Sequence, residues 1–353
     1  MKDTLVKNFI KLAKIDSISG EEFRVKKYLK GVFRSMGMSF KEDKIGNIFV
    51  PAKNPKILLT AHLDTVEPGR NIQVLIKRNK LVSKGKTIIG GDNKAGLALI
   101  ITLLSNLRDE DRKKVEVLLT VKEEIGLVGV KNFNHKQIKS NFGISFDKSD
   151  QKFGEIIVTG TNYAEFFEIT LTGEASHSAR PRPESNPLNL LLTMFSKYKP
   201  GIIAEGSTFN IGAISGFEQV NSSPRQIIVK GDIRSGSFKA VDKFINKLEN
   251  FAKKSLFKVK FSIRRTVVSS GYLLKPKDSG YKELIKALAT NGYFPKILNK
   301  GSITDASVIS IAGKPTYILS CGVYDTHKTT EYVEIKELLK AYEFTKYFIE
   351  KNL

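Results

Sequence analysis

Short, nearly continuous apolar runs alternate in the first half of the chain with stretches in which apolar residues recur every three or four positions. The runs at 56–61, 115–121 and 142–146 have the length of buried strands and end at polar residues. The apolar stretch at 88–104 contains Gly-Gly before an Asp and has the length of a buried helix. This alternation predicts an open α/β sheet.

The pattern changes near residue 163, where the elements follow the order βαββαβ. The predicted strands and helices are 166–171, 187–198, 208–214, 226–233, 239–253 and 257–263. This order predicts a small α+β, ferredoxin-like domain with its own antiparallel sheet. Helix and strand patterns of the first kind return afterwards. We therefore expect a core domain formed by 1–162 and 267–353, with an inserted domain at 163–266.

A capping-box pattern precedes the second predicted helix. Ser19 is followed three residues later by Glu22, and the apolar positions of a helix begin at Val25. Gly37 stands where a glycine commonly follows the end of a helix. The pattern predicts a helix start at this Ser-Glu pair.

Polar side chains of one kind gather at the ends of the predicted strands and at the turn before the buried helix. They are His62, Asp64, Asp92, Glu123, Glu124 and Asp147. The carboxyl ends of strands in an open α/β sheet form the edge at which ligands bind. Each residue alone also has a structural interpretation, as a core histidine, a helix N-cap, a solvated acid or a turn residue. Together they predict one site.

A site with this many carboxylates needs a cation, because their mutual repulsion would otherwise raise their pKa values and destabilise the fold. His327 arrives at the same site from a late strand end. Cys321 is the only cysteine, which excludes an intrachain disulfide and a thiolate cluster. Imidazole with carboxylate suits zinc, with cobalt or manganese as alternatives, and Asp92 can bridge two ions.

Two pairs of residues close in sequence have different expected roles within each pair. Glu123 and Glu124 are adjacent, so their side chains point in different directions, and one can bind metal while the other acts as general base. His62 and Asp64 are two apart on an extended chain and point the same way. We interpret Asp64 as the partner that fixes the His62 imidazole tautomer.

The chain is strongly basic, with 58 Lys and Arg against 36 Asp and Glu, a formal net charge of +22. The lysines are spread along helical faces without a long run or interleaved aromatics, so we interpret the charge as solvated surface and expect no nucleic-acid partner. The N-terminal helix pattern is broken by lysines, and no apolar run reaches membrane length. We expect a cytoplasmic protein without a membrane partner.

Five ordered motifs resemble those of the co-catalytic dinuclear zinc exopeptidases and deacylases. They are HLDTV at 62–66, GGDNKAG at 90–96, KEEIG at 122–126, SFD at 145–147 and HKTTE at 327–331. That family includes peptidase T, dipeptidases, glutamate carboxypeptidase, aminoacylase and succinyl-diaminopimelate desuccinylase. The resemblance covers nearly the whole chain, including KIDSISGEE at 14–22 and GSITDASVISIAGKP at 301–315. It is strongest to the peptidase T group, because Asp147 stands where the carboxypeptidase side more often has Glu.

The resemblance implies a fold and a set of roles. The fold is a zinc-exopeptidase-type mixed sheet flanked by helices, with the insertion as a lid. One zinc would be held by His62, Asp92 and Asp147 and the other by Asp92, Glu124 and His327. Glu123 would be the general base, Asp64 would lie behind His62, and the Asp92-Asn93 peptide bond would be cis.

The lid contributes further residues by the same resemblance. His177 in GEASHSARP corresponds to the lid histidine that polarises the scissile carbonyl, often in the partner subunit, so we expect a homodimer formed through the lid. Asn221 and Arg234 have the spacing of lid residues that hold a substrate carboxylate. The alternative for His177 is a surface loop histidine, and for Arg234 it is a surface charge at a strand end. Asn93, Lys148 and the Ser-Ala pair after His177 depart from the usual motifs, which leaves substrate choice open.

The expected activity is metal-dependent exopeptidase hydrolysis of small peptides, of the aminopeptidase or tripeptidase kind. An N-acyl amino-acid deacylase, or a carboxypeptidase or dipeptidase of the same fold, is the enzyme alternative. A non-catalytic basic binding protein is the remote alternative, and the presence of every ligand and of the base argues against it.

Overall fold

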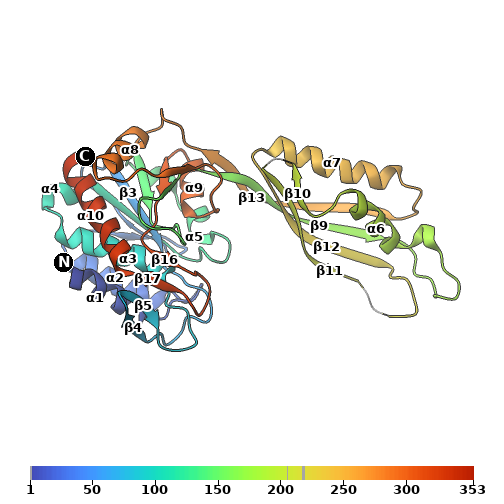
Figure 1. The fold of residues 1–353 in the computed structure, drawn as a ribbon, viewed down its shortest axis with the longest axis horizontal. Coiled ribbons are helices and arrows are strands. Elements are labelled where there is room, and N and C mark those ends of the chain that lie inside the picture. Colours follow the sequence, from blue (N-terminus) through green and yellow to red (C-terminus); the bar gives the residue numbers. More distant parts are fainter. Residues whose placement is uncertain (1, 205, 217–218) are drawn as a thin grey trace. The chain divides into compact units, whose positions relative to one another are not determined.

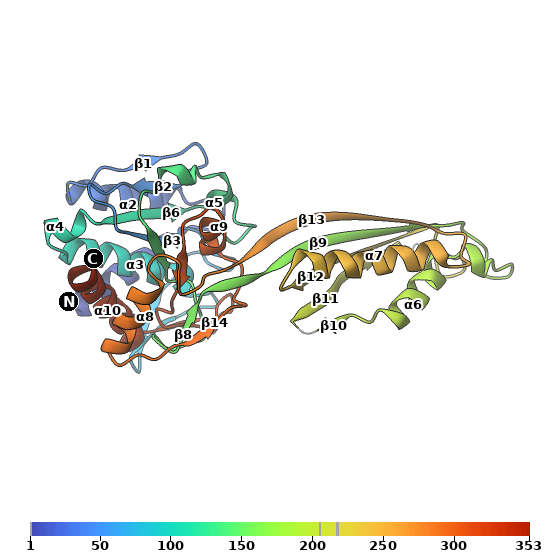
Figure 2. The ribbon, with the colours of Figure 1, turned by 90° about the horizontal axis from the view of Figure 1, so that it is seen from above.

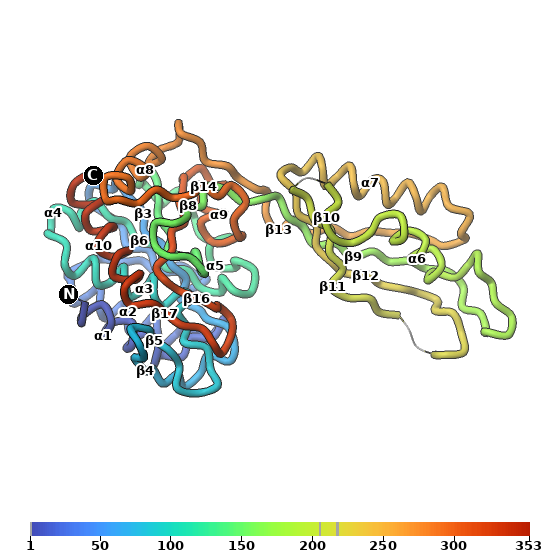
Figure 3. Tube along the Cα trace, in the orientation of Figure 1, coloured from blue at the N-terminus to red at the C-terminus, as the bar shows by residue number. Residues whose placement is uncertain are grey.

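The computed structural model describes residues 2–204, 206–216 and 219–353, which form two compact units (Figure 1). The main unit comprises Met1–Gly160 and Leu273–Leu353, and the insertion comprises Thr161–Tyr272. Both chain ends lie in the main unit (Figure 3). The chain enters the insertion through β9 (Gly160–Thr172) and leaves it through β13 (Lys260–Leu273), so the predicted bounds at 163 and 266 both fall inside these two strands.

The large sheet of the main unit is mixed. Its order is β1 (Lys41–Glu42), β2 (Ile48–Val50), β6 (Val115–Thr120), β3 (Ile57–His62), β7 (Phe142–Ser145), β15 (Thr316–Ile318), β8 (Ile156–Val158) and β14 (Lys296–Leu298). The neighbours β6, β3, β7 and β15 run parallel. Strand β2 is antiparallel to β6, and β8 is antiparallel to β15. The three strands predicted from the apolar runs thus form the centre of the sheet, and their carboxyl ends meet at one edge.

Helices flank this sheet, as the mixed α/β fold requires. They are α1 (Lys2–Ala13), α2 (Phe23–Ser35), α3 (Gly91–Asn106), α4 (Asp109–Arg112), α5 (Val128–Asn132), α8 (Tyr281–Thr290), α9 (Asp305–Ile311) and α10 (Ile335–Asn352), with a 3₁₀ turn η1 (His135–Gln137). Helix α3 is the predicted buried helix: its residues 93–104 are all buried, with α1 and α10 packed against it. Within the described residues, none of the helices has both the length and the apolar character to cross a bilayer.

The capping-box prediction is wrong. Helix α2 begins at Phe23, and its N-cap Glu22 makes no side-chain capping bond. The Ser19 hydroxyl instead donates to the Asp64 carboxylate at 2.7 Å. The Glu22 carboxylate accepts from the backbone N–H groups of Gly20 and Lys122, at 2.8 and 3.1 Å. Both side chains therefore serve tertiary contacts at the carboxyl edge of the sheet.

A small antiparallel sheet in the main unit has no counterpart in the sequence pattern. Its order is β16 (Val323–Tyr324), β17 (Tyr332–Glu334), β5 (Lys80–Ser83) and β4 (Val74–Lys77). Strands β16 and β17 are the two ends of the loop that contains His327. The pairing of β17 with β5 fixes where this loop leaves the body of the unit.

The insertion follows the predicted order of elements with one addition. Helix α6 (Pro187–Lys197), preceded by a 3₁₀ turn η2 (Pro183–Ser185), comes before β10 (Gly201–Ala204), β11 (Ser207–Ser215), β12 (Gln226–Ser235) and α7 (Phe238–Lys254). The strand order is β10-β11-β12-β9-β13. Strand β10, which the sequence pattern missed, pairs with β11 as an antiparallel edge strand.

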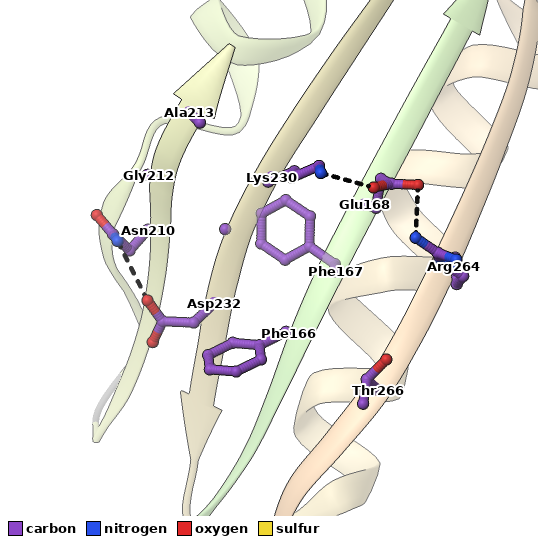
Figure 4. Close-up of a pocket in the computed structure, with 11 residues that line it drawn as sticks. Phe166, Phe167, Glu168, Asn210, Gly212, Ala213, Lys230, Asp232, Arg264 and Thr266 are labelled. Atoms are coloured by element: carbon purple, nitrogen blue, oxygen red, sulfur yellow. Dashed lines mark hydrogen bonds and ion pairs between the residues drawn. The ribbon is translucent and has the colours of Figure 1, made fainter. Parts of the chain in front are cut away.

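The two faces of this sheet differ because β12 alternates. Ile227, Val229 and Ile233 belong to a buried core together with residues of α6 and α7. These two helices are drawn beside the sheet in Figure 2. On the opposite face, Glu168 binds Lys230 at 3.2 Å and Arg264 at 3.0 Å beside a shallow cavity of about 520 Å³ (Figure 4). This open face therefore combines paired charges with the exposed side chain of Phe166.

Candidate metal centre

The main sheet brings the predicted ligands of the first half of the chain to one edge. His62 is the last residue of β3 and lies opposite Thr120, the last residue of β6. Glu123 and Glu124 follow β6, and Asp147 follows β7. Because β6, β3 and β7 are parallel neighbours, all of these side chains start from the carboxyl edge of the sheet.

Asp92 lies at the centre of the cluster, with its two carboxylate oxygens facing different histidines. Oδ1 is 3.0 Å from His62 Nε2, and Oδ2 is 3.6 Å from His327 Nε2. On the first side, Asp147 Oδ1 is 3.8 Å from His62 Nε2. On the second side, Glu124 Oε1 is 3.0 Å from His327 Nε2. The geometry thus has two groups of ligands that share one carboxylate.

The peptide bond between Asp92 and Asn93 is cis, as the resemblance implied. The Asn93 side-chain amide donates to Asp147 Oδ1 at 3.3 Å. Asn93, which replaces the more usual acid at this position, therefore supports a ligand of the first group.

The donor set fits divalent cations. One ligand atom each from His62, Asp92 and Glu124 lies within 4.8 Å of the other two, which is close enough for metal binding by this cluster. Two imidazoles and three carboxylates without a thiolate form a set that zinc accepts. Cys321 is buried, and its thiol faces the backbone carbonyl oxygen of Phe146 at 3.6 Å. A metal-binding site at this edge is the chemistry that these residues support.

The acids around the two histidines favour the charged form of each imidazole. Burial opposes a charge on His62, yet hydrogen bonds to Asp64 and Asp92 raise its pKa well above the usual value. Hydrogen bonds to Asp92 and Glu124 raise the pKa of His327 to about 10. Burial opposes the ionisation of Asp92, but the same two histidines lower its pKa. A metal ion must therefore displace protons from both imidazoles.

Two acids of the cluster have the opposite shift. Burial raises the pKa of Glu123 to about 10; the His62 charge lowers it, and neighbouring Asp147 and Asp305 raise it further. Burial also raises the pKa of Asp147 well above its ordinary value, and the neighbouring Asp92 adds to the shift. These carboxylates need added positive charge nearby to be ionised at neutral pH. Two divalent cations would supply it.

Asp64 has a wider role than the one predicted for it. Its carboxylate lies 3.5 Å from His62 Nδ1, but the shorter contact of that nitrogen, 3.0 Å, is to the Asp64 backbone carbonyl. The carboxylate also accepts from the backbone N–H groups of Glu123 and Glu124, at 3.0 and 3.1 Å. With the Ser19 hydroxyl, it therefore fixes the turn that carries both glutamates as well as the His62 ring.

Three buried charged residues at the site had no predicted role. Glu331 is 1% exposed and accepts from the N–H groups of Gly90 and Asp92 at 2.8 and 3.0 Å. Burial raises the pKa of Glu331 to about 7. Its place in HKTTE, four residues after His327, was the available signal.

Lys94 and Asp305 are the other two. Lys94 is fully buried, and its Nζ donates to the carbonyl oxygen of Ile15 at 2.7 Å, while burial lowers its pKa to about 8. Asp305 accepts a hydrogen bond from the Thr120 hydroxyl, and burial raises its pKa to about 6. Both residues belong to sequence motifs that we noted, but a motif does not say whether a charged side chain is buried.

The lid residues fall into two separate places within the insertion. His177 is exposed and forms an isolated bridge with Ser222, and the Ser178 N–H donates to the Asn221 carbonyl at 2.9 Å. His177 and Asn221 are therefore in neighbouring loops. Arg234 lies eight residues beyond the start of β12, roughly 26 Å along the strand.

Arg234 is half-exposed, and its Nε donates to Asp232 at 2.9 Å. The strand between them means that the structure does not bring Asn221 and Arg234 of one chain together. A carboxylate held by both side chains would need them to come from different chains.

Known proteins share both the sequence and the fold. Residues 58–351 match the profile described as Peptidase family M20/M25/M40. The uncharacterized protein YqjE of Bacillus subtilis (strain 168) is 28% identical over 98% of both chains. A tripeptidase from Staphylococcus aureus subsp. aureus Mu50 is 26% identical with a TM-score of 0.92, over 99% of this chain and 98% of that chain. The aminopeptidase PepT from Bacillus cereus ATCC 10987 is 28% identical with a TM-score of 0.91, over the same shares.

The family match covers most of the chain and includes each residue of the cluster around Asp92. The fold agrees with the two solved structures over nearly their full length. This chain belongs to Peptidase family M20/M25/M40 and is a metal-dependent exopeptidase that acts on peptides.

Proposed function

We propose that the chain is an aminopeptidase that removes the first residue from short peptides with a free amino terminus, tripeptides above all. The observation that carries the proposal is the Asp92 carboxylate, whose two oxygens face the histidines of two ligand groups. The similarity to a tripeptidase and to an aminopeptidase over 99% of the chain supports this substrate class. The proposed metal is zinc, two ions per chain.

Each of the two ligand groups would hold one zinc ion. His62, Asp92 and Asp147 would hold one, and Asp92, Glu124 and His327 would hold the other. When bound, the zinc ions supply Lewis-acid chemistry, because they polarise the scissile carbonyl and lower the pKa of a nearby water to about 7. The two histidines bind in their neutral form, with His62 oriented by the backbone carbonyl and carboxylate of Asp64.

Glu123 is the proposed general base. Its backbone N–H is fixed by Asp64, its neighbour Glu124 faces His327, and its own carboxyl lies within electrostatic range of His62 and Asp147. In the ionised state it takes a proton from the attacking water at one carboxylate oxygen. It then gives that proton to the nitrogen of the leaving amine. This division of labour needs Glu123 to remain free of metal.

The proposed assembly is a homodimer formed through the insertion, with His177 of one chain acting in the site of the other. The support is the separation within one chain: His177 and Asn221 lie in loops past the far end of β9, and Arg234 pairs with Ala164 near the start of that strand. In this arrangement His177 donates to the developing oxyanion, and Arg234 binds the carboxylate of the substrate.

The test of the reaction compares two adjacent variants, Glu123→Gln and Glu124→Gln. Each protein is measured for metal content and for cleavage of a tripeptide with either a free or an acetylated amino terminus. The proposal predicts that wild type binds about two zinc ions and cleaves only the unblocked peptide. Glu123→Gln should keep the metal and lose activity by about 100-fold or more. Glu124→Gln should lose activity together with part of the metal.

Other outcomes point elsewhere. Wild type that binds metal but releases only the acyl group of N-acyl amino acids would be a deacylase. Folded wild type without metal would contradict the assignment of the ligands. Equal metal loss in both variants would contradict the separate role of Glu123.

The dimer is tested by complementation. Glu123→Gln and His177→Ala are each expected to be inactive, and mixing them after dissociation should restore activity if His177 acts in the partner's site. A chain that is monomeric by light scattering, or a mixture without recovery, would remove the proposed role in trans.

A further inference from the structure

Glu331 connects the turn that carries Asp92 with the loop that carries His327. Its carboxylate accepts from the N–H groups of Gly90 and Asp92, one to each oxygen. Its own N–H donates to the Lys328 carbonyl at 3.0 Å, within the loop that begins at His327. One buried side chain thus ties the backbone of Asp92 to the His327 loop.

The turn at 90–92 is packed tightly against neighbouring side chains at Gly91. A Cβ added to Gly91 would lie 2.8 Å from side-chain carbons of Val323 and Val333, and 3.2 Å from Glu331 Oε1. The glycine lets the turn lie directly against β16 and β17. The contact between Glu331 and the turn therefore depends on glycine at position 91, because any side chain there would push the turn away.

The Glu331 carboxylate has a buried cationic neighbour. Lys94 lies two residues after Asp92, is fully buried, and interacts electrostatically with Glu331. Lys94 is itself fixed by its hydrogen bond to the Ile15 carbonyl. A buried carboxylate with a cationic neighbour and two N–H donors has what it needs to stay in place.

The two metal positions differ in how firmly their histidines are held. His62 is 2% exposed, ends a central strand, and contacts Asp92 at 3.0 Å. The His327 side chain is 50% exposed, stands on a loop, and lies 3.6 Å from the other Asp92 oxygen. The second position is therefore the one that depends on the tie between the loop and the Asp92 turn.

We propose that Glu331 is a positioning residue that sets the distance between Asp92 and His327 and thereby keeps the second metal position occupied. The proposal rests on the two-metal assignment made above. It predicts an asymmetric effect: loss of Glu331 weakens the position formed by Glu124 and His327 and leaves the His62 position nearly unchanged. Glu331 itself touches neither the metal ions nor the substrate.

The test is titration of the metal-depleted full-length protein with Co²⁺, followed by absorption and calorimetry, for wild type, Glu331→Gln and Glu331→Ala. Wild type should bind two equivalents. The affinity for the second should fall by about 10 to 100-fold in Glu331→Ala, with a smaller loss in Glu331→Gln, which retains one acceptor oxygen. The first affinity should change little. Glu334→Gln, an acid three residues later on β17, is the matched control and should titrate as wild type.

Gly91→Ala tests the contact between Glu331 and the Asp92 turn by changing the turn. It should displace the Asp92 turn from Glu331 and weaken the second affinity in the same way, with Glu331 unchanged. Agreement between the two variants supports the positioning role.

Three outcomes would contradict the proposal, and each has a different meaning. Equal weakening of both affinities in Glu331→Gln, with a lower melting temperature, would show a general structural role and overturn the proposal. Two wild-type affinities in Glu331→Ala would also overturn it. Wild type that binds no cobalt would defeat the metal assignment itself and this proposal with it.

Discussion

Replacement of Asp64 by Asn should impair the site although it removes none of the proposed metal ligands. The carboxylate accepts hydrogen bonds from the Ser19 hydroxyl and from the N–H groups of Glu123 and Glu124, at 2.7 to 3.1 Å. Asn keeps the shape but has one acceptor oxygen in place of two. At least one of the two backbone N–H groups would then face an amide NH₂, which cannot accept.

The magnitude follows from these contacts. Hydrogen bonds to a charged group contribute about 1.5 to 3 kcal/mol each, and an unsatisfied buried donor costs about 1 to 3 kcal/mol. Asp64 is fully buried, so water cannot replace the lost acceptor. We expect unfolding to become easier by about 2 to 4 kcal/mol. The turn that carries the base and a ligand also shifts, so kcat should fall about 10 to 100-fold.

The assay measures kcat and KM on an unblocked tripeptide, metal content and thermal unfolding. Ser19→Ala removes one of the three hydrogen bonds and should give a smaller loss. Asp43→Asn is the matched control, because Asp43 accepts from the N–H groups of Ile45, Gly46 and Asn47 without touching the site. It should lower stability with unchanged kcat. Asp64→Asn with wild-type kcat and metal content would refute the reasoning.

Three further predictions follow. Burial raises the pKa of Glu123 to about 10 from its ordinary 4.5, so the folded metal-free chain keeps a proton that the unfolded chain loses. Stability should therefore fall with rising pH between these values, by at most about 1.4 kcal/mol per pH unit. Thermal unfolding of the chelated protein at pH 5 and 8 checks this, and Glu123→Gln should flatten the dependence. Gly96→Ala places a Cβ 2.2 Å from Asn93 Oδ1 and should destabilise by about 1 to 3 kcal/mol in thermal unfolding, whereas Gly31→Ala, where nothing lies within 4 Å, should not. Arg234→Ala should raise KM about tenfold for a tripeptide with a free carboxyl terminus and leave the amidated peptide unchanged; equal effects on both would contradict carboxylate binding.

The main features of the fold could be predicted because they depend on local pattern. The apolar runs at 56–61, 115–121 and 142–146 contain enough information to place three neighbouring strands, and parallel strands bring their ends together without further input. The proposed ligands His62, Glu124 and Asp147 could therefore be predicted from their positions at or after the ends of these strands. The fifth strand of the insertion's sheet, the edge strand β10, was missed because four residues carry too weak a pattern.

The features that could not be predicted depend on partners distant in sequence. Ser19 and Glu22 have the local signature of a helix cap, yet both side chains are bound by the sheet edge, because Asp64 and Lys122 lie there only in the folded chain. Glu331 stands in the HKTTE motif, but the motif does not reveal its partners, since its two donors are about 240 residues away. Such contacts arise from packing between loops, which periodicity and spacing do not encode.

Anomalous diffraction at the zinc edge from crystals of the zinc-loaded protein tests the central claim most directly. The account predicts two peaks about 3.5 to 4 Å apart, one on each side of the Asp92 carboxylate, with Glu123 outside both coordination spheres. A single peak, peaks away from Asp92, or Glu123 bound to an ion would contradict it.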